Sequence, residues 1–237
     1  ADNMGIAEAA SSGGVLEYMP TEIYPGIVVN MQTLYMSWLT MAIVAIIVFA
    51  ATRNIQEVPS GVQNLVEMFV EWLNGLMDTN IGVAGRRIAA PFVITLFLYL
   101  FIGNEIGMLP QIGIHISSPT NDVNVPLALA LMVSVTVYIY GVSQKGFAYF
   151  KHLVEPFAVM LPLNILEEVA KPVTMALRLF GNILAGEILL EVLYKLVPFL
   201  VPNVWIGFSL IIGFLQAFIF TMLTVIAIAP AFRSEHK

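Results

Sequence analysis

Long apolar runs alternate with short polar stretches along most of the chain, a pattern typical of a membrane protein with several spanning helices. A helix needs about 20 mostly apolar residues to cross the hydrocarbon core of a bilayer. The fourth run is too long for one perpendicular crossing and contains three prolines, so we expect a long helix that is tilted or bent. The pattern predicts five crossings, at residues 31–51, 88–110, 123–142, 153–196 and 204–229.

Residues 60–78 follow a different pattern from the five apolar runs. Apolar side chains recur at spacings of three and four residues from Val62 to Leu73, while Glu67 and Glu71 belong to the opposite, polar face. This periodicity predicts an amphipathic helix that lies in the membrane interface and does not cross the bilayer. Its polar face is acidic, so we expect either a structural surface helix or a docking face for partner subunits, with no attraction to anionic lipid.

The composition supports an all-α integral membrane protein. Hydrophobic residues make up 59% of the 237 residues and charged residues 11%, against about 25% charged residues in a typical soluble domain. There are no cysteines and three widely separated histidines, so we expect no disulfide, no thiolate chemistry, no metal site and no cofactor. Residues 31–237 are expected to form a single membrane domain.

The distribution of basic residues predicts the orientation of the chain in the membrane. Residues 1–30 contain four acidic residues and no Lys or Arg, which is not typical of a secretory signal peptide. We therefore expect an N-terminal segment on the outer side and a cytoplasmic C-terminus, with Lys195 as the one basic residue of the outer loops. The basic residues that this orientation places in the cytoplasm are Arg53, Arg86, Arg87, Lys145, Lys151, Arg233 and Lys237.

The fourth apolar run contains most of the unusual polar residues, and helical geometry separates them onto different faces. At 100° per residue, Glu187 points about 180° away from Arg178, and Glu191 lies one turn beyond Glu187. Gly181 and Ala185 form a pair of small residues that allows another helix to approach closely. One side of the helix is expected to carry Lys171, Thr174, Arg178, Gly181, Asn182 and Ala185.

Arg178 has two possible explanations at this stage. Arginine stays protonated in proteins and is costly inside a membrane, so it needs a partner or a function. It could form an ordinary buried ion pair with Glu167 or Glu168 that holds two helices together. The small residues around it favour a contact with a moving surface instead, because a static ion pair does not need a smooth face.

The other polar residues also have structural explanations. Glu191, and the glutamate one turn before it, could reach the membrane interface. Gln216, in the last apolar run, could form a hydrogen bond between helices. Asp122 could cap a helix that starts near Pro126. The neighbouring residues 104 and 105, Asn and Glu, could mark a helix end near the lipid headgroups.

Three sequence motifs together resemble the signature of a known family. They are AKPVTMALRLFGNILAGEI at 170–188, PTNDVNVPLALAL at 119–131 and LQAFIFTMLTVI at 215–226. Their residues, order and spacing resemble those of subunit a of F-type rotary ATP synthases, and the resemblance extends from about residue 30 to the end of the chain. It implies an outer spanning helix, an interfacial helix, a helical hairpin and two long tilted helices that pack on a ring of c subunits.

The resemblance also implies roles for individual residues. Arg178 corresponds to the family's essential arginine, which faces the carboxylate of each passing ring subunit. Some relatives carry histidine at the positions of Ser209 and Glu187, so Glu187 is expected to carry more of the ion relay in this chain. The ion pathway is expected to include Glu187, Asn182, Gln216, Asp122, Glu191, Ser209 and Glu168. The residues expected to face the c-ring are Thr174, Gly181 and Ala185.

The implied function is that of a stator subunit without catalytic activity of its own. It would couple the flow of H⁺ or Na⁺ across a membrane to rotation of the c-ring and to ATP synthesis. Its expected partners are the c-ring, the b subunits of the peripheral stalk, membrane lipid and the rest of the complex. The expected location is the bacterial cytoplasmic membrane or, alternatively, the thylakoid membrane. A secondary transporter or channel with a buried arginine is the alternative function, and a membrane-embedded enzyme is a weaker one.

Overall fold

The computed structural model describes residues 20–24, 27–53, 55–56, 58–108, 117–153, 160–197 and 200–232. Within these residues, five helices are long and apolar enough to cross a membrane, which confirms the expected fold class of an all-α integral membrane protein. They are α2 (Met31–Thr52), α3 (Val62–Ile106), α4 (Asn124–Lys145), α5 (Leu161–Leu196) and α6 (Val201–Phe232).

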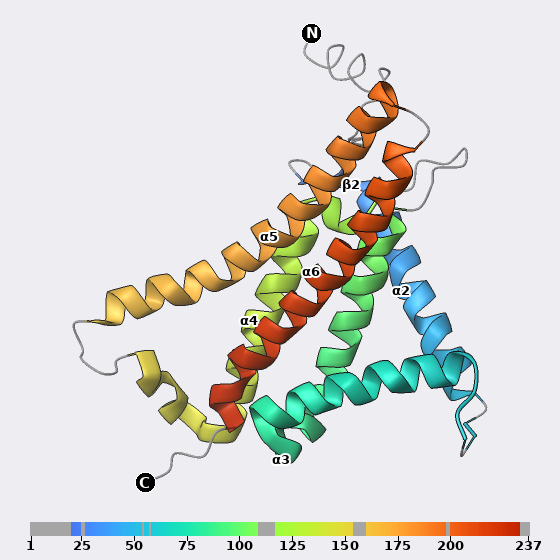
Figure 1. The fold of residues 1–237 in the computed structure, drawn as a ribbon. Coiled ribbons are helices and arrows are strands. Elements are labelled where there is room, and N and C mark those ends of the chain that lie inside the picture. The colour runs from blue at the N-terminus through green and yellow to red at the C-terminus, as the bar shows by residue number, and fades with distance from the viewer. Residues whose placement is uncertain are drawn as a thin grey trace.

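Helix α3 contains a sharp corner, and its two halves run in different directions. Gly82 has φ 68° and ψ 171° inside the helix, a conformation that glycine adopts readily and other residues rarely do. In Figure 1 the first half of α3 lies across the base of the molecule, and the second half rises through the bundle. Asp78 and Arg86 form an ion pair of 3.0 Å across the corner. The sequence predicted two separate helices with a connection between residues 78 and 88. In the structure this connection is helical except at Gly82.

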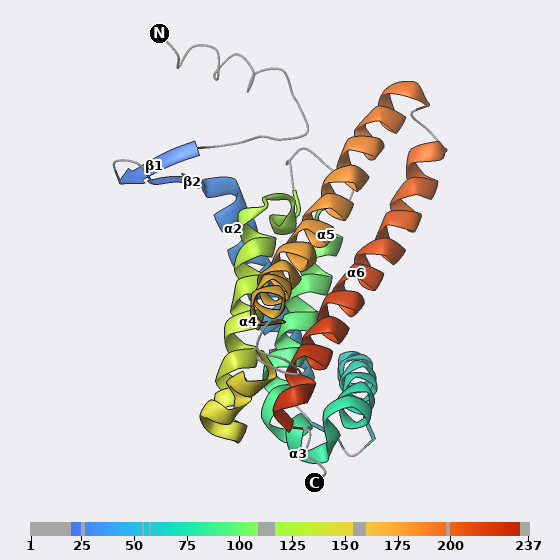
Figure 2. The ribbon, with the colours of Figure 1, turned by 90° about the vertical axis from the view of Figure 1, so that its left-hand side faces the viewer.

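Helices α5 and α6 form a long, tilted pair that lies side by side at one end of the molecule (Figures 1 and 2). Helix α5 begins at Leu161 and not near residue 153 as predicted, because Gly146–Leu153 forms a short 3₁₀ segment, η2, that folds back on α4. Gly146 starts this segment with φ 63°, where a side chain would be strained. Toward its start, α5 diverges from α6 (Figure 1).

The apolar core lies where α6 packs against α3, α4 and α5. Trp72 from the first half of α3 packs against Phe218 of α6, with the ring planes tilted by 33° and the ring centroids 5.1 Å apart. Helix α2 packs mainly on α3, and most of its side chains are exposed. Large exposed apolar side chains on all five helices are expected for a surface that faces lipid. The largest fully buried apolar side chains are Phe97, Phe220, Met77, Leu100, Leu179, Ile183 and Ile228.

A short β-hairpin precedes α2 and was not predicted from the sequence. Its strands, β1 (Pro20–Tyr24) and β2 (Ile27–Asn30), pair in an antiparallel register. Asn30 ends the hairpin and caps α2, because its side-chain oxygen accepts a hydrogen bond of 3.2 Å from the backbone N–H of Gln32. Most of the remaining N-terminal segment lies outside the described residues.

The helices alternate in direction, so the loops gather at two opposite ends. The end of α3, a 3₁₀ turn η1 (Pro119–Asn121), the end of α5 and the start of α6 lie at one end, which we call the η1 end. The corner of α3, η2 and the end of α6 lie at the other, the η2 end. An ion that crosses the membrane along this chain must pass from one of these ends to the other.

Candidate functional site

Three of the ionisable side chains of helix α5 that the sequence singled out lie at separate levels along it. Glu168 lies near its start, Arg178 near its middle and Glu187 near its end. Ten residues separate the first two and nine the last two, which corresponds to about 15 Å and 14 Å along a helix that rises 1.5 Å per residue. These three side chains therefore place an acid, a cation and an acid in succession from the η2 end toward the η1 end.

Glu187 contacts the turn η1, which approaches from a distant part of the sequence. One carboxylate oxygen accepts a hydrogen bond of 3.4 Å from the backbone N–H of Ser118, and the other accepts one from the side-chain amide of Asn121. A Cβ atom at Gly107 would lie 2.6 Å from the Ser118 side chain. The absence of a side chain at Gly107 thus lets η1 pack against the end of α3 and reach α5.

A buried hydrogen-bond network ties η1 to α3 and α6. The Ser118 hydroxyl donates to the carbonyl of Gly103 at 2.7 Å, and the Thr120 hydroxyl donates to the side-chain oxygen of Asn104 at 2.9 Å. The Asn104 amide in turn donates to the carbonyl of Gly213 in α6 at 3.2 Å. Asn104 is fully buried, so it does not mark a helix end at the headgroups, as the sequence allowed. The network fixes the position of the turn that holds Glu187.

Helices α5 and α6 are joined by a second polar contact, between the levels of Arg178 and Glu187. The side-chain amide of Asn182 donates a hydrogen bond of 2.8 Å to the side-chain oxygen of Gln216. Gln216 is buried, whereas Asn182 lies on the exposed side of α5. Ser209 is also buried, two turns before Gln216 on α6, and its hydroxyl has no hydrogen-bond partner among the described residues.

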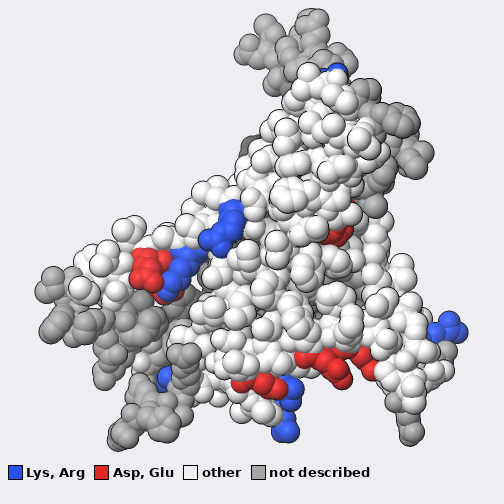
Figure 3. Space-filling model, in the orientation of Figure 1, with Lys and Arg blue, Asp and Glu red and all other residues white. Residues whose placement is uncertain are grey.

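Arg178 lies on an exposed, largely small-residue face of α5. Thr174, Gly181 and Ala185 are exposed on the same helix, and a Cβ atom at Gly181 would meet nothing within 4 Å. Within the described part of the chain, Arg178 forms no hydrogen bond and no ion pair. Figure 3 shows acidic and basic atoms side by side over the first half of α5, whereas the surface toward the end of the helix is mostly uncharged.

Glu168 belongs to a separate group at the start of α5. Lys171 lies 2.6 Å from the Glu168 carboxylate and 3.3 Å from that of Glu167. The hydroxyl of Tyr138 in α4 donates a hydrogen bond of 3.1 Å to the other Glu168 oxygen. Both glutamates that could have formed a static ion pair with Arg178 are thus paired with Lys171, which speaks against a purely structural role for Arg178.

A comparison with known protein families agrees with the resemblance of the three motifs. A family model described as ATP synthase A chain matches residues 34–229. The chain belongs to this family. As a subunit a of ATP synthase, it is an integral membrane component of that complex and takes part in ion transport.

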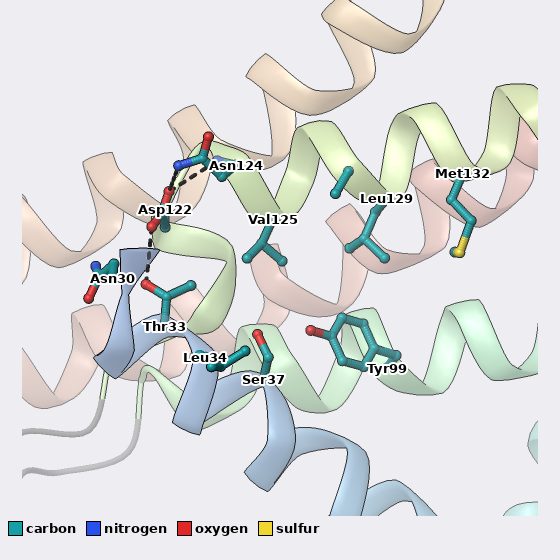
Figure 4. A pocket seen from close by; sticks show the side chains of 11 residues that line it. Asn30, Thr33, Leu34, Ser37, Tyr99, Asp122, Asn124, Val125, Leu129 and Met132 are labelled. Carbon is teal, nitrogen blue, oxygen red and sulfur yellow. Dashed lines mark hydrogen bonds between the residues drawn. The ribbon is translucent and has the colours of Figure 1, made fainter. Parts of the chain in front are cut away.

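The structure of this ATP synthase subunit places Asp122 apart from the Glu187 group. Figure 4 shows its carboxylate facing α2, where it accepts a hydrogen bond of 3.2 Å from the Thr33 hydroxyl. It also accepts two from Asn124, one of them from the backbone N–H at 3.0 Å, at the start of α4. The N-cap residue of α4 is Val123, without a side-chain cap, so Asp122 contacts the start of the helix from one position before the cap. The cavity beside it, between α2, α3 and α4, has a volume of about 470 Å³ and is lined by Ser37 and Tyr99 among others.

Sequence reasoning thus named some residues of subunit a that the structure brings into contact, and it missed others. The hydrogen-bonded pair Asn182 and Gln216 was expected in one pathway. Glu191 instead pairs with Lys195 at 2.6 Å on the surface of α5. The residues around Glu187 that were missed are Ser118, Thr120, Asn121 and Asn104. The signal that could have found them is a run of polar residues, 117–122, directly after an apolar span.

Proposed function

We propose that this subunit provides two ion half-channels, one at each end of the bundle, that meet at a c-ring facing Arg178. The observation that carries the proposal is the exposed position of Arg178, without a partner among the described residues, between the acidic groups of Glu168 and Glu187. The subunit itself is a stator component without catalytic activity.

The cost of a charge in a membrane supports a partner that covers Arg178. A side chain that cannot lose its proton is expensive in hydrocarbon. An ionised carboxylate on a neighbouring subunit would compensate this charge, and the carboxylate is itself costly to bury without a partner. Arg178 therefore holds each passing ring carboxylate in its ionised form and blocks a direct leak between the two half-channels.

The shape of α5 supports contact with a moving surface. Thr174, Gly181 and Ala185 leave a shallow face around Arg178, and the space beside Gly181 is open. Small residues allow close helix–helix approach, so a ring helix can come close to α5 beside Arg178. The ring rotates past this face, and each of its carboxyl groups loses its ion to one half-channel and regains one from the other.

The two acidic groups extend to opposite ends of the bundle. The Glu187 group, with Asn182, Gln216 and Ser209, leads to the η1 end, and Glu168 leads to the η2 end. The bias of basic residues puts the η1 end on the outer side, in the cytoplasmic membrane of a bacterium. The membrane potential then supplies about 2.3 kcal/mol per charge per 100 mV, so several ions must cross for each ATP.

The partners follow from the same arrangement. The c-ring covers the face of Arg178, and the b subunits of the peripheral stalk hold the subunit against rotation. Membrane lipid covers the apolar sides. A secondary transporter or channel, the alternative function, would need a substrate for Arg178 inside a central cavity, whereas Arg178 lies on an outer face.

The test is an Arg178→Ala variant in the complete ATP synthase, reconstituted in vesicles. We expect the complex to assemble, because Arg178 has no fixed partner among the described residues, and ATP synthesis to be lost. Arg178→Lys keeps a charge but loses the planar, permanently protonated group, and we expect it to fail as well. Subunit content is checked by gel. An assembled Arg178→Ala complex that makes ATP at the wild-type rate would overturn the proposal.

A further inference from the structure

Glu105 is a partly buried carboxyl group that has no part in the proposed function so far. It lies in the last turn of α3, and its carboxylate points at α6. A Cβ atom at Gly213 would lie 2.8 Å from the Oε1 atom of Glu105. This oxygen is buried and accepts no hydrogen bond from any described residue. The Glu105 carboxylate therefore occupies space that a side chain at residue 213 would otherwise fill.

Two other buried polar atoms at the same junction lack a hydrogen-bond partner among the described residues. They are the Ser209 hydroxyl oxygen and the side-chain oxygen of Asn121. Ser209 lies one turn before Gly213 on the buried face of α6. A Cβ atom at Gly186 would lie 4.0 Å from the Ser209 hydroxyl, and the residue after Gly186 is Glu187. Asn121 contacts Glu187 directly through its amide.

These atoms outline a polar line from Glu105 to Glu187. Buried polar atoms in native proteins are nearly always hydrogen-bonded, and those without a protein partner are usually bound to ordered water. Three such atoms between α3, α5, α6 and η1 indicate a hydrated passage. An acid within hydrogen-bond reach of such water can take up and release protons.

We propose that Glu105 is a second ion-relay residue of the half-channel at the η1 end. This inference rests on the proposed function. The Glu105 carboxylate takes a proton from water at the η1 end and passes it to water beside Ser209. That water passes a proton to the carboxylate of Glu187. Glu105 is then ionised again, and one proton has moved from the water at the η1 end to Glu187. An acid on α3 thus acts beside a serine on α6.

The first experiment separates acid chemistry from packing. Glu105→Gln keeps the shape of the side chain and removes the acid, whereas Glu105→Asp keeps the acid and shortens the side chain. We expect ATP-driven ion pumping by the assembled complex to slow about tenfold or more in Glu105→Gln and to stay close to the wild-type rate in Glu105→Asp. Glu71→Gln, at an exposed glutamate of the first half of α3, is the matched control and should pump normally.

A wild-type pumping rate in assembled Glu105→Gln would overturn the relay. A Glu105→Asp variant that pumps as slowly as Glu105→Gln would also overturn the relay, because the pumping rate would then depend on the length of the side chain and not on its acidity. Glu187→Gln is measured in parallel to separate this inference from the proposed function. If both Gln variants pump normally, the half-channel at this end is wrong. If Glu187→Gln is slow and Glu105→Gln is not, the half-channel stands without Glu105.

The second experiment tests the hydration of the passage. The chain has no native cysteine, so a single Ser209→Cys reports its own reactivity. We expect a small water-soluble thiol reagent to modify it in the native complex. Val225→Cys, on the same helix and buried in the apolar core, should remain unmodified. Absence of modification at Ser209→Cys, with full modification after unfolding in detergent, would show a dry junction and overturn the passage.

Discussion

Two glutamates of the same helix, Glu187 and Glu168, are held in different ways. Glu187 is bound by uncharged donors from η1, a backbone N–H and a side-chain amide, far away in the sequence. Glu168 is bound by a cation three residues later on its own helix and by a tyrosine hydroxyl. The first contact is tertiary and mostly buried, and the second is mainly local and partly exposed. We therefore expect the Glu187 group to be the more sensitive of the two to substitution.

The largest effect is expected from Glu187→Gln. Glutamine keeps an oxygen that can accept from Asn121, so η1 should stay docked, but it can no longer carry a proton. We expect ATP-driven pumping in reconstituted vesicles to fall by roughly 10²-fold or more, the scale of a lost acid–base group. The matched control is Glu191→Gln, one turn further along α5, where the exposed pair with Lys195 is worth about 1 kcal/mol or less.

Normal pumping in a fully assembled Glu187→Gln complex would show that Glu187 is no more important for pumping than Glu168.

Glu187→Ala tests in addition whether Glu187 holds η1 in place. It leaves the buried Asn121 amide without an acceptor, at a cost of about 1–3 kcal/mol. We expect this variant to lose pumping and to lower the thermal stability of the purified complex. The stability is measured as the fraction of the subunit that stays in the complex on heating.

The second prediction concerns the face that separates the two glutamates. Gly181→Leu places a large side chain into the open space beside Arg178. Leucine favours a helix over glycine by up to about 1 kcal/mol, so folding should not suffer, but the side chain should obstruct the ring. We expect ATP synthesis to fall several-fold in an assembled complex. Gly75→Leu is the control, because Gly75 is also helical with nothing within 4 Å of its Cβ position.

A Gly181→Leu complex with wild-type synthesis would mean that the ring does not pass over this part of α5. The two half-channels would then have to meet elsewhere. If synthesis falls while the passive ion flux through the membrane sector is unchanged, the result would show that rotation and not ion access is affected.

The third prediction is a smaller effect at Glu168. Glu168→Gln removes an ion pair that is partly exposed, and Lys171 keeps Glu167 as a partner at 3.3 Å. Partly exposed pairs of this kind stabilise proteins by about 1 kcal/mol or less, so we expect normal assembly and a few-fold slower pumping. Glu167→Gln, at the more exposed neighbour, should have no effect. A loss at Glu168 as large as that at Glu187 would contradict the comparison.

The contrast between the two glutamates also explains what the sequence could predict. Apolar length predicted the five spanning helices, and the 3.6-residue period predicted the shared face of Arg178, Gly181 and Asn182, because both depend on local geometry. The partners of Glu187 depend on how η1 folds back between α3 and α5, which no local period reveals. A change of direction between the interfacial helix and the next crossing was predicted, but its position at Gly82 was not, since a single glycine in a helical pattern does not show where a helix bends.

The same limit applies to the residues at the end of α3. Asn104 and Glu105 were interpreted as a polar helix end, because the sequence does not show that Gly213 of α6 leaves room beside them. Their burial results from close packing between two helices more than 100 residues apart. Such contacts require the three-dimensional arrangement, even where the residue types are suggestive.

The last prediction tests which glutamate belongs to which side of the membrane, with no expected effect on rates. Val123 and Ser143 are exposed at the η1 and η2 ends of α4, and neither takes part in the groups around Glu187 and Glu168. Single cysteines at these positions, in a chain that otherwise has none, should react with a membrane-impermeant thiol reagent from opposite sides. The excess of basic residues at the η2 end predicts that Val123→Cys reacts from outside and Ser143→Cys from the cytoplasm. Reaction from the same side would contradict an α4 that crosses the membrane. Opposite but reversed labelling would keep the five crossings and exchange the roles of the two glutamates, so that Glu168 and not Glu187 would lie in the outer half-channel.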